Sequence, residues 1–361
     1  MVFKVTLLEN GLVQQDLSIL AGKNKYFENE SLLFEKNENS ELLAVYKPPT
    51  QEFFENVFNP SGSFWKLYID RGFGLMPFCN YVFFISGGMY FLKNVENRFI
   101  SSIGMQKSYA LNGDLFEEKK ALTFENLLLA ITAPFDALKQ LSRTIEFVFF
   151  ANEMIAEFEK FQKMAGEYYG NYGVELNITD PLKTARESLD LAVQSTYYSN
   201  IALLCSSLKL RLKKSESIDN CELSRLKSIF VQRDFSSIKK DFGFYSINPY
   251  DITEKRFKDI DAQDMKKLGI PESPKDYALK WRENAKFLCA RFLDVQRAAY
   301  KKLGESTELS DLIYYLTVSE LEQFIPQKID GAFDLASSRK RLFEQYSLVN
   351  LPSKIIYCSG Q

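Results

Sequence analysis

Residues 144–161 read TIEFVFFANEMIAEFEKF, and this stretch does most to decide the fold. Its apolar positions recur at intervals of three and four residues, as the 3.6-residue turn of an α-helix requires. They are Ile145, Val148, Ala151, Ile155, Phe158 and Phe161. Four charged residues of the stretch fall off this stripe: Glu153, Glu157, Glu159 and Lys160. The spacing therefore predicts a long helix that packs one face against a core.

Helical patterns continue towards the C-terminus. Three glycines are expected to end the long helix: Gly166, Gly170 and Gly173. Asp180-Pro181 should begin the next helix, with Asp as the cap and Pro at the first helical position, and that helix is expected to reach Lys213-Lys214. Further helices are predicted at about 221–232, 274–303, 308–325 and 330–346, before the apolar run Ile355-Ile356-Tyr357.

The first hundred or so residues are mixed. Short strands are expected at Val2–Leu8 and at Glu41–Tyr46. Pro48-Pro49 should stop the second strand, because the proline ring removes a backbone donor. A helix is then predicted from Thr50 to Phe58, with Thr50 as its cap.

Residues 81–92 carry the clearest β pattern. The β-prone runs Tyr81–Ile85 and Met89–Leu92 flank Ser86-Gly87-Gly88, whose glycines can take the positive φ of a tight turn. We therefore predict a hairpin near 81–92. The expected fold class is mainly α with a small α/β N-terminal lobe, divided into residues 1–118 for that lobe and 119–361 for a multi-helix lobe.

Composition removes much of the catalytic repertoire. The 361 residues include 45 Lys and Arg against 47 Asp and Glu, a net charge of -2, which supplies no cationic field for nucleic acid. The chain has no histidine. It therefore cannot supply a histidine base, a histidine metal ligand or a phosphohistidine.

The spacing of the cysteines and the length of the apolar runs indicate where the protein is located and whether it crosses a membrane. The five cysteines are scattered and form no Cys-x-x-Cys pair, which favours reduced thiols and a cytoplasmic protein; they are Cys79, Cys205, Cys221, Cys289 and Cys358. The apolar runs fall short of the ~18–20 residues of a membrane span. We expect neither a membrane nor a nucleic acid among the partners, and no metal site.

Phosphate-binding motifs are missing from the sequence. It contains neither a Walker-type Gly-x-x-x-x-Gly-Lys-Ser/Thr loop nor a Gly-x-Gly-x-x-Gly turn. The basic run Lys209–Lys214 could bind phosphate, but we expect it to end a helix, where cations interact favourably with the macrodipole.

An aromatic-rich segment at 241–257 reads DFGFYSINPYDITEKRF. Its Gly and Asn-Pro are typical of a loop, yet it carries Phe and Tyr residues that a plain surface loop would avoid. Such a loop either packs over a core or lines a pocket.

This segment also carries a family resemblance. Gly243 to Ile252 resembles the segment Gly-His-Leu-Arg-Pro-Gly-Thr-Tyr-Asp-Ile of phosphoenolpyruvate-synthase-like phosphotransferases, a group that includes L-glutamine kinase and rifampicin phosphotransferase. The matching residues are Gly243, Tyr250, Asp251 and Ile252, and Arg256-Phe257 falls where the family has Arg-Tyr. The resemblance continues in DLIYYLTVSEL at 311–321, similar to the family's Asp-Leu-x-Tyr-Leu-Thr-x-x-Glu-Leu. It also includes Arg282–Phe287, Lys302–Gly304 and Leu351–Ile356, and a weaker similarity lies upstream at Phe64–Phe73 and the Gly87-Gly88 hairpin.

The resemblance implies a place in a relay. In that family an ATP-grasp domain passes a phosphoryl group from ATP to a histidine on a swivelling domain, which carries it to an acceptor. The chain resembles the helical acceptor or linker region between those parts, so ATP and Mg²⁺ are implied only for the complete system and no cofactor for this chain. Where the family has His, Leu, Arg and Pro, this sequence has Phe244, Tyr245, Ser246 and Ile247, which removes a titratable ring and a guanidinium.

Two functional hypotheses follow. In the first, the chain positions a small-molecule acceptor for a phosphohistidine or ATP-grasp domain, which lies either on a separate protein or in a part of the protein outside this sequence. Asp251 orients a hydroxyl or amide, Arg256 pairs with a carboxylate or phosphate, and Tyr245 and Tyr250 form the wall. In the second, it is a non-catalytic scaffold derived from such an enzyme. A structural alternative stays open for the loop, in which Asp251 caps a helix and pairs with Arg256 while the tyrosines pack. Whether the chain is itself part of an enzyme is left open, with no catalytic residue assigned.

Overall fold

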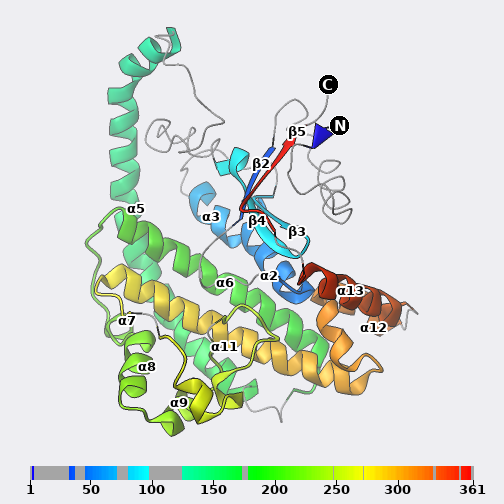
Figure 1. Cartoon of the computed structure of the whole chain (residues 1–361). Helices are drawn as coiled ribbons and strands as arrows, with labels where there is room; N and C mark the ends of the chain where they lie inside the picture. Colours follow the sequence, from blue (N-terminus) through cyan, green and yellow to red (C-terminus); the bar gives the residue numbers. More distant parts are fainter. Residues whose placement is uncertain are drawn as a thin grey trace.

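The structure, a computed structural model, describes residues 2–3, 32–36, 45–70, 80–96, 124–172, 178–246, 248–270, 272–327, 331–348 and 351–358. A small antiparallel sheet sits at one end of a larger helical body (Figure 1). Helices α6 (Pro181–Ser207) and α11 (Tyr277–Ser306) run side by side through that body and make its most extensive contact. The expected fold class, mainly α with a small α/β lobe, is confirmed.

The predicted hairpin is confirmed as one edge of the sheet. β3 (Val82–Ile85) and β4 (Gly88–Leu92) pair in antiparallel fashion, with Ile85 opposite Gly88. The two residues between them, Ser86 and Gly87, have φ values of 48° and 76°, as a two-residue type I′ turn demands.

The sheet brings together strands from the two ends of the described chain. The strand order is β1-β5-β2-β4-β3, and β5 (Lys354–Cys358) lies between β1 (Val2–Phe3) and β2 (Leu32–Lys36). The range 119–361 thus supplies a strand to the small lobe as well as the helices. The apolar run at 355–357 pairs there because its Ile355 is completely buried against the sheet's core.

The two strands predicted near the N-terminus lie mostly outside the described residues. Of Val2–Leu8 only Val2 and Phe3 lie among the described residues, in β1, and of Glu41–Tyr46 only residues 45 and 46, which belong to no strand. The backbone N–H of Tyr46 instead donates to the carbonyl of Gly87 at 2.8 Å, and its carbonyl accepts from the Gln51 side chain at 2.7 Å. The strand β2 was not predicted.

Helix α2 (Pro48–Phe58) begins two residues earlier than expected. Pro48 and Pro49 start the helix, since its first turn needs no intrahelical N–H donor and the proline φ suits it. Lys47 in extended conformation is therefore the cap, and the assignment of Thr50 to that role was wrong. Helix α3 (Ser63–Asp70) follows.

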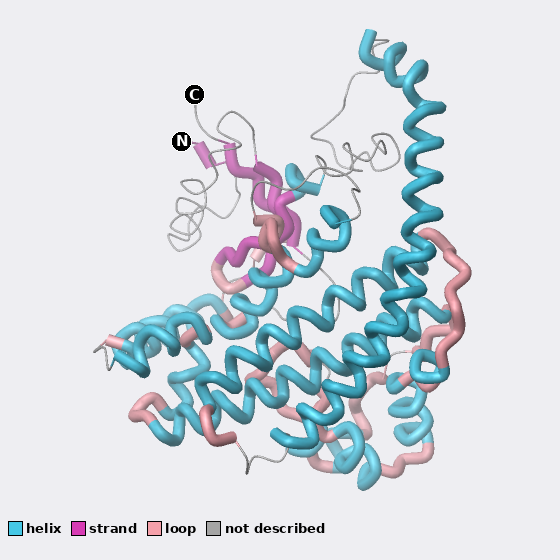
Figure 2. Tube along the Cα trace, turned by 180° about the vertical axis from the view of Figure 1, so that it is seen from behind, coloured by secondary structure: helices cyan, strands magenta, loops and turns pink. Residues whose placement is uncertain are grey.

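Helix α5 (Phe124–Tyr172) continues through Gly166 and Gly170, so the prediction that these glycines end it was wrong; Gly173 lies outside the described residues. A glycine costs a helix only ~1 kcal/mol relative to alanine, and the buried Phe161 and Ala165 hold the helix against the core nearby. The N-terminal part of α5 extends away from the helical body (Figure 2).

The apolar stripe of this helix is confirmed over its second half. Ala151, Ile155, Phe158 and Phe161 are buried, whereas Ile145 is 51% exposed and Val148 is half-buried. Phe147 and Phe150 are buried in their place at the start of the stripe. The four charged residues expected off the stripe are exposed.

Asp180 caps α6 as predicted, since its Oδ1 accepts from the backbone N–H of Lys183 at 3.0 Å. The helix ends at Ser207 and not at Lys213-Lys214, because the chain turns at Lys209, whose φ is 51°. The basic run therefore lies beyond the helix and not in its last turn. The other helical elements are α7 (Glu216–Asp219), α8 (Glu222–Val231), α9 (Phe235–Phe242), η2 (Phe257–Asp259), α10 (Ala262–Met265), η3 (Ser310–Tyr315), α12 (Val318–Gln327) and α13 (Ala332–Tyr346).

A buried carboxylate ties the small lobe to the C-terminal helices. Glu52 of α2 accepts hydrogen bonds from the backbone N–H groups of Val318 and Ser319, at 2.6 and 3.1 Å, and from the Ser319 hydroxyl at 2.6 Å. A carboxylate at a helix N-terminus satisfies free donors and interacts favourably with the macrodipole. This contact fixes the start of α2 beside η3 and α12, where the candidate site lies.

Candidate functional site

The loop 243–257 closes on itself and on α11. The N–H groups of Phe257 and Lys258 donate to the carbonyls of Tyr245 and Gly243, at 2.8 and 3.2 Å. Tyr245 stacks on Phe287 with ring centroids 4.4 Å apart and planes 4° apart. Its aromatic surface is therefore used in packing.

Arg256 lies in the interior, with no exposed surface. Its Nη1 donates to the Ser246 hydroxyl at 2.8 Å, and its Nε is 3.7 Å from Oδ1 of Asp294, which is 3% exposed. Burial lowers the pKa of the Arg256 guanidinium, and the charge of Asp294 opposes that shift. The other carboxylate oxygen of Asp294 accepts from the Tyr169 hydroxyl and from Lys258. Arg256 is thus half of a buried ion pair.

Asp251 and Tyr250 hold the loop in place. Oδ1 of Asp251 accepts from the backbone N–H and from the hydroxyl of Thr253, both at 2.8 Å, which closes a short turn and not a helix. Tyr250 stacks on Phe53 of α2, with centroids 5.7 Å apart. The structural alternative is thus correct in the packing of the tyrosines. Its other two parts are wrong, because Asp251 caps no helix and Arg256 pairs with Asp294 instead.

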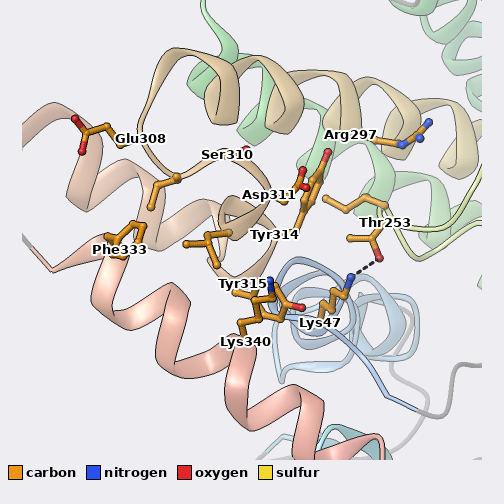
Figure 3. Close-up of a pocket in the computed structure, with 13 residues that line it drawn as sticks. Lys47, Thr253, Arg297, Glu308, Ser310, Asp311, Tyr314, Tyr315, Phe333 and Lys340 are labelled. Carbon is orange, nitrogen blue, oxygen red and sulfur yellow. Dashed lines mark hydrogen bonds between the residues drawn. The ribbon is translucent and has the colours of Figure 1, made fainter.

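A pocket of about 600 Å³ lies on the other side of this turn, between the start of α2, the 250s turn, η3 and α13 (Figure 3). We call it the Lys47 pocket. The described residues that line it are Lys47, Ile252, Thr253, Arg297, Glu308, Leu309, Ser310, Asp311, Leu312, Tyr314, Tyr315, Phe333 and Lys340.

Lys47 is directed across the floor of the pocket. Its Nζ donates to the Thr253 hydroxyl at 3.1 Å, as Figure 3 shows, and lies 5.6 Å from the centroid of the Tyr315 ring. A cation over an aromatic face is attracted by the ring quadrupole. Lys47 forms no ion pair with a described residue, so its charge stays available to a ligand.

Two contacts position η3, which forms one wall of the Lys47 pocket. Gly304, near the end of α11, lets η3 approach closely, because an added Cβ would come within 2.6 Å of the Ser310 carbonyl oxygen. Arg339 of α13 donates to the carbonyl of Tyr315 at 3.1 Å and binds Glu320 in a two-pronged ion pair, with both distances 2.6 Å. These contacts hold Tyr315 against α13.

The pocket carries three basic and two acidic side chains. Arg297 is already paired with Asp259, at 2.9 Å. Within the described part of the chain Lys340 forms no ion pair, nor do the exposed acids, Glu308 and Asp311. Phe333, which is 54% exposed, adds an apolar edge. The pocket can therefore hold an anionic group beside a hydrogen-bond donor, within aromatic walls.

The four residues predicted for a site do not line this pocket: Tyr245, Tyr250, Asp251 and Arg256. The loop they belong to does, through Ile252 and Thr253. Asp311 and Tyr314-Tyr315 carry the resemblance at 311–321 and could have been proposed from it. Lys47 and Lys340 had no sequence signal, since single lysines are common on surfaces.

Among the described residues, no group of three or more His, Cys, Asp or Glu side chains is arranged to hold a metal ion. Within the same part of the chain, no helix combines the length and the apolar character needed to cross a bilayer. The three cysteines whose side chains are described are buried free thiols: Cys205, Cys221 and Cys289. No family model and no curated protein matches this chain.

Proposed function

We propose that the chain is a binding module that holds a small acceptor molecule in the Lys47 pocket, as part of a phosphoenolpyruvate-synthase-like phosphotransfer system. One observation carries the proposal. Two of the segments in which the sequence resembles that family, 243–252 and 311–321, lie far apart in the chain. Their residues Ile252, Asp311, Leu312, Tyr314 and Tyr315 nevertheless line the same cavity.

The Lys47 pocket offers the chemistry expected of an acceptor site, although its residues are not the four that the sequence predicted. Lys47 and Lys340 pair with a carboxylate or phosphate of the acceptor. Asp311 and Glu308 accept hydrogen bonds from its hydroxyl or amide, and the ring of Tyr315 forms a wall. Phosphoryl transfer depends mainly on positioning and electrostatics, so a module without a nucleophile can serve it. The histidine that carries the phosphoryl group, and the site for ATP and Mg²⁺, lie outside these 361 residues.

Calorimetric titration with malate and with pyrophosphate tests the binding step. Malate combines two carboxylates with a hydroxyl, and pyrophosphate carries charge alone. Lys47→Ala and Lys340→Ala should each weaken binding about tenfold, which corresponds to one charge-assisted hydrogen bond.

Arg341→Ala is the matched control, because Arg341 is an exposed neighbour of Lys340 on α13 that does not line the pocket. It changes the net charge equally and should bind malate as the wild type does. If Arg341→Ala weakened malate binding as much as Lys340→Ala does, the effect would be a general charge attraction and not a contact in the pocket. Malate binding of wild-type strength in both lysine variants would contradict the proposal.

The second candidate is a scaffold that has kept the fold and lost the chemistry. It is favoured by the packing of Phe244 and Tyr245, which occupy positions where the family has His and Leu. Addition of a phosphohistidine-bearing protein with ATP and Mg²⁺ separates the two candidates. Phosphorylation of an acceptor that depends on Lys47 supports the binding module, whereas a stable complex without turnover supports the scaffold.

A further inference from the structure

A second hollow, of about 390 Å³, lies at the opposite end of α2, between the α2–α3 turn and the middle of α6. We call it the Asp190 pocket. The described residues that line it are Asn56, Asn59, Ser61, Gly62, Ser63, Lys66, Asp190, Val193, Gln194, Tyr197 and Tyr198. This set and the lining of the Lys47 pocket have no residue in common.

The turn that forms one rim is tightly built. Oδ1 of Asn59 accepts from the N–H and the hydroxyl of Ser61, at 2.9 and 3.0 Å. Gly62 is required at the next position, since an added Cβ would come within 2.4 Å of the Val57 carbonyl oxygen. The hydroxyls of Ser63 and Thr196 then join the start of α3 to α6. The rim is thus fixed without a ligand.

The charged groups of this pocket balance each other. It holds one cation, Lys66, and one anion, Asp190, and neither forms an ion pair with a described residue. Partial burial raises the pKa of Asp190, and the charges of Glu322 and Glu187 add to the shift against that of Arg186. A carboxylate without a donor of its own can accept hydrogen bonds from a ligand.

The remaining lining groups both donate and accept. Three carboxamides, from Asn56, Asn59 and Gln194, and two hydroxyls, from Ser61 and Ser63, line the pocket. Oδ1 of Asn59 and both hydroxyls already bond within the rim, so the carboxamides of Asn56 and Gln194 are the main groups offered to a ligand. The half-buried ring of Tyr197 supplies aromatic surface beside them, whereas Tyr198 is 7% exposed and packs on Phe158 and Phe161. A ligand that satisfies such a set carries several hydroxyls, is neutral overall, and has an apolar C–H face to lie on a ring.

We propose that the Asp190 pocket is a second binding site, which takes a neutral polyhydroxylated ligand of the carbohydrate class. Its chemistry differs from that of the Lys47 pocket, which has one excess positive charge. The volume lies within the roughly 300–1,000 Å³ of ligand pockets. The site is independent of the proposed acceptor function, because its residues are separate.

Saturation-transfer NMR of the full chain with glucose, galactose, mannose and N-acetylglucosamine tests this site. At least one sugar should give a signal in the wild type. Asp190→Ala and Gln194→Ala should each weaken its binding about tenfold, through loss of hydrogen bonds to the sugar hydroxyls.

Glu187→Ala is the matched control, since Glu187 lies one turn earlier on α6 and does not line the pocket. It should bind the sugar normally, as should Lys340→Ala, whereas Asp190→Ala should keep wild-type affinity for malate. No signal from any of the four sugars, or a signal that survives both Asp190→Ala and Gln194→Ala, would overturn the proposal. Either result leaves the Lys47 pocket untouched.

Discussion

Two faces of one loop use similar residues in different ways. On the face towards α11, Arg256 is completely buried and paired with Asp294. On the opposite face, Thr253 meets Lys47 at the floor of a pocket. Arg256 and Lys47 are both cations beside the same turn, but only Lys47 can reach a ligand. Residue type alone therefore does not separate a binding cation from a structural one, whereas burial and existing partners do.

The largest effect is expected on the buried face. Arg256→Met leaves the buried Asp294 carboxylate with only the partly exposed Lys258 and Arg297 as cations, and should lower the free energy of unfolding by about 3 kcal/mol. Urea unfolding measures this loss, and the folded protein should bind malate normally. The double variant Arg256→Met/Asp294→Leu should lose less than the sum of the single changes. If Arg256→Met lost malate binding but kept its stability, Arg256 would have to be a ligand-binding residue.

The turn between the two faces should respond more moderately. Asp251→Ala removes the acceptor of two hydrogen bonds from Thr253 and should cost about 2 kcal/mol of stability, seen as a lower melting temperature. Asp251→Asn keeps an oxygen acceptor and should recover more than half of that loss. Equal stability of the wild type and the Ala variant would show that the turn does not depend on this carboxylate.

The ion pair behind the pocket wall should give a smaller, pH-dependent effect. Burial raises the pKa of Glu320, but the hydrogen bonds from Arg339 and from the backbone of Thr317 outweigh it and hold the pKa below its usual value. A carboxylate with a lowered folded-state pKa stabilises the fold fully above its unfolded pKa and loses that contribution as the pH falls through the folded pKa. Glu320→Gln should therefore cost about 1 kcal/mol at neutral pH and less at about pH 3, below the usual pKa of a glutamate. Urea unfolding at both pH values measures the difference, and a constant difference would contradict the assignment.

The smallest stability change is expected on the pocket face. Thr253→Val keeps the side-chain shape but removes the hydrogen bond from Lys47 and the one that the hydroxyl donates to Asp251. It should cost about 1 kcal/mol, because the backbone N–H of Thr253 still binds Asp251. Malate affinity should nevertheless fall, because Lys47 loses its anchor, and Thr253→Ser should restore it. A larger loss of stability than in Arg256→Met would reverse the comparison between the two faces.

Local patterns predicted much of the fold, and the failures share a physical cause. The hairpin at 82–92 and the cap at Asp180 depend on neighbours in sequence, so they could be predicted. Gly166 and Gly170 did not end α5, because packing against the core outweighs the cost of a glycine. Pro48-Pro49 was ambiguous, since proline both stops a strand and starts a helix.

The sequence by itself determined the helical class, the hairpin and the lack of any histidine, because composition and short-range periodicity need no knowledge of distant contacts. Only the tertiary structure decided that β5 lies between β1 and β2, that Arg256 is buried, and that Lys47, Asp311 and Lys340 border one pocket. These residues are remote in the chain, and their meeting depends on the packing of α2, η3 and α13, which no local pattern specifies.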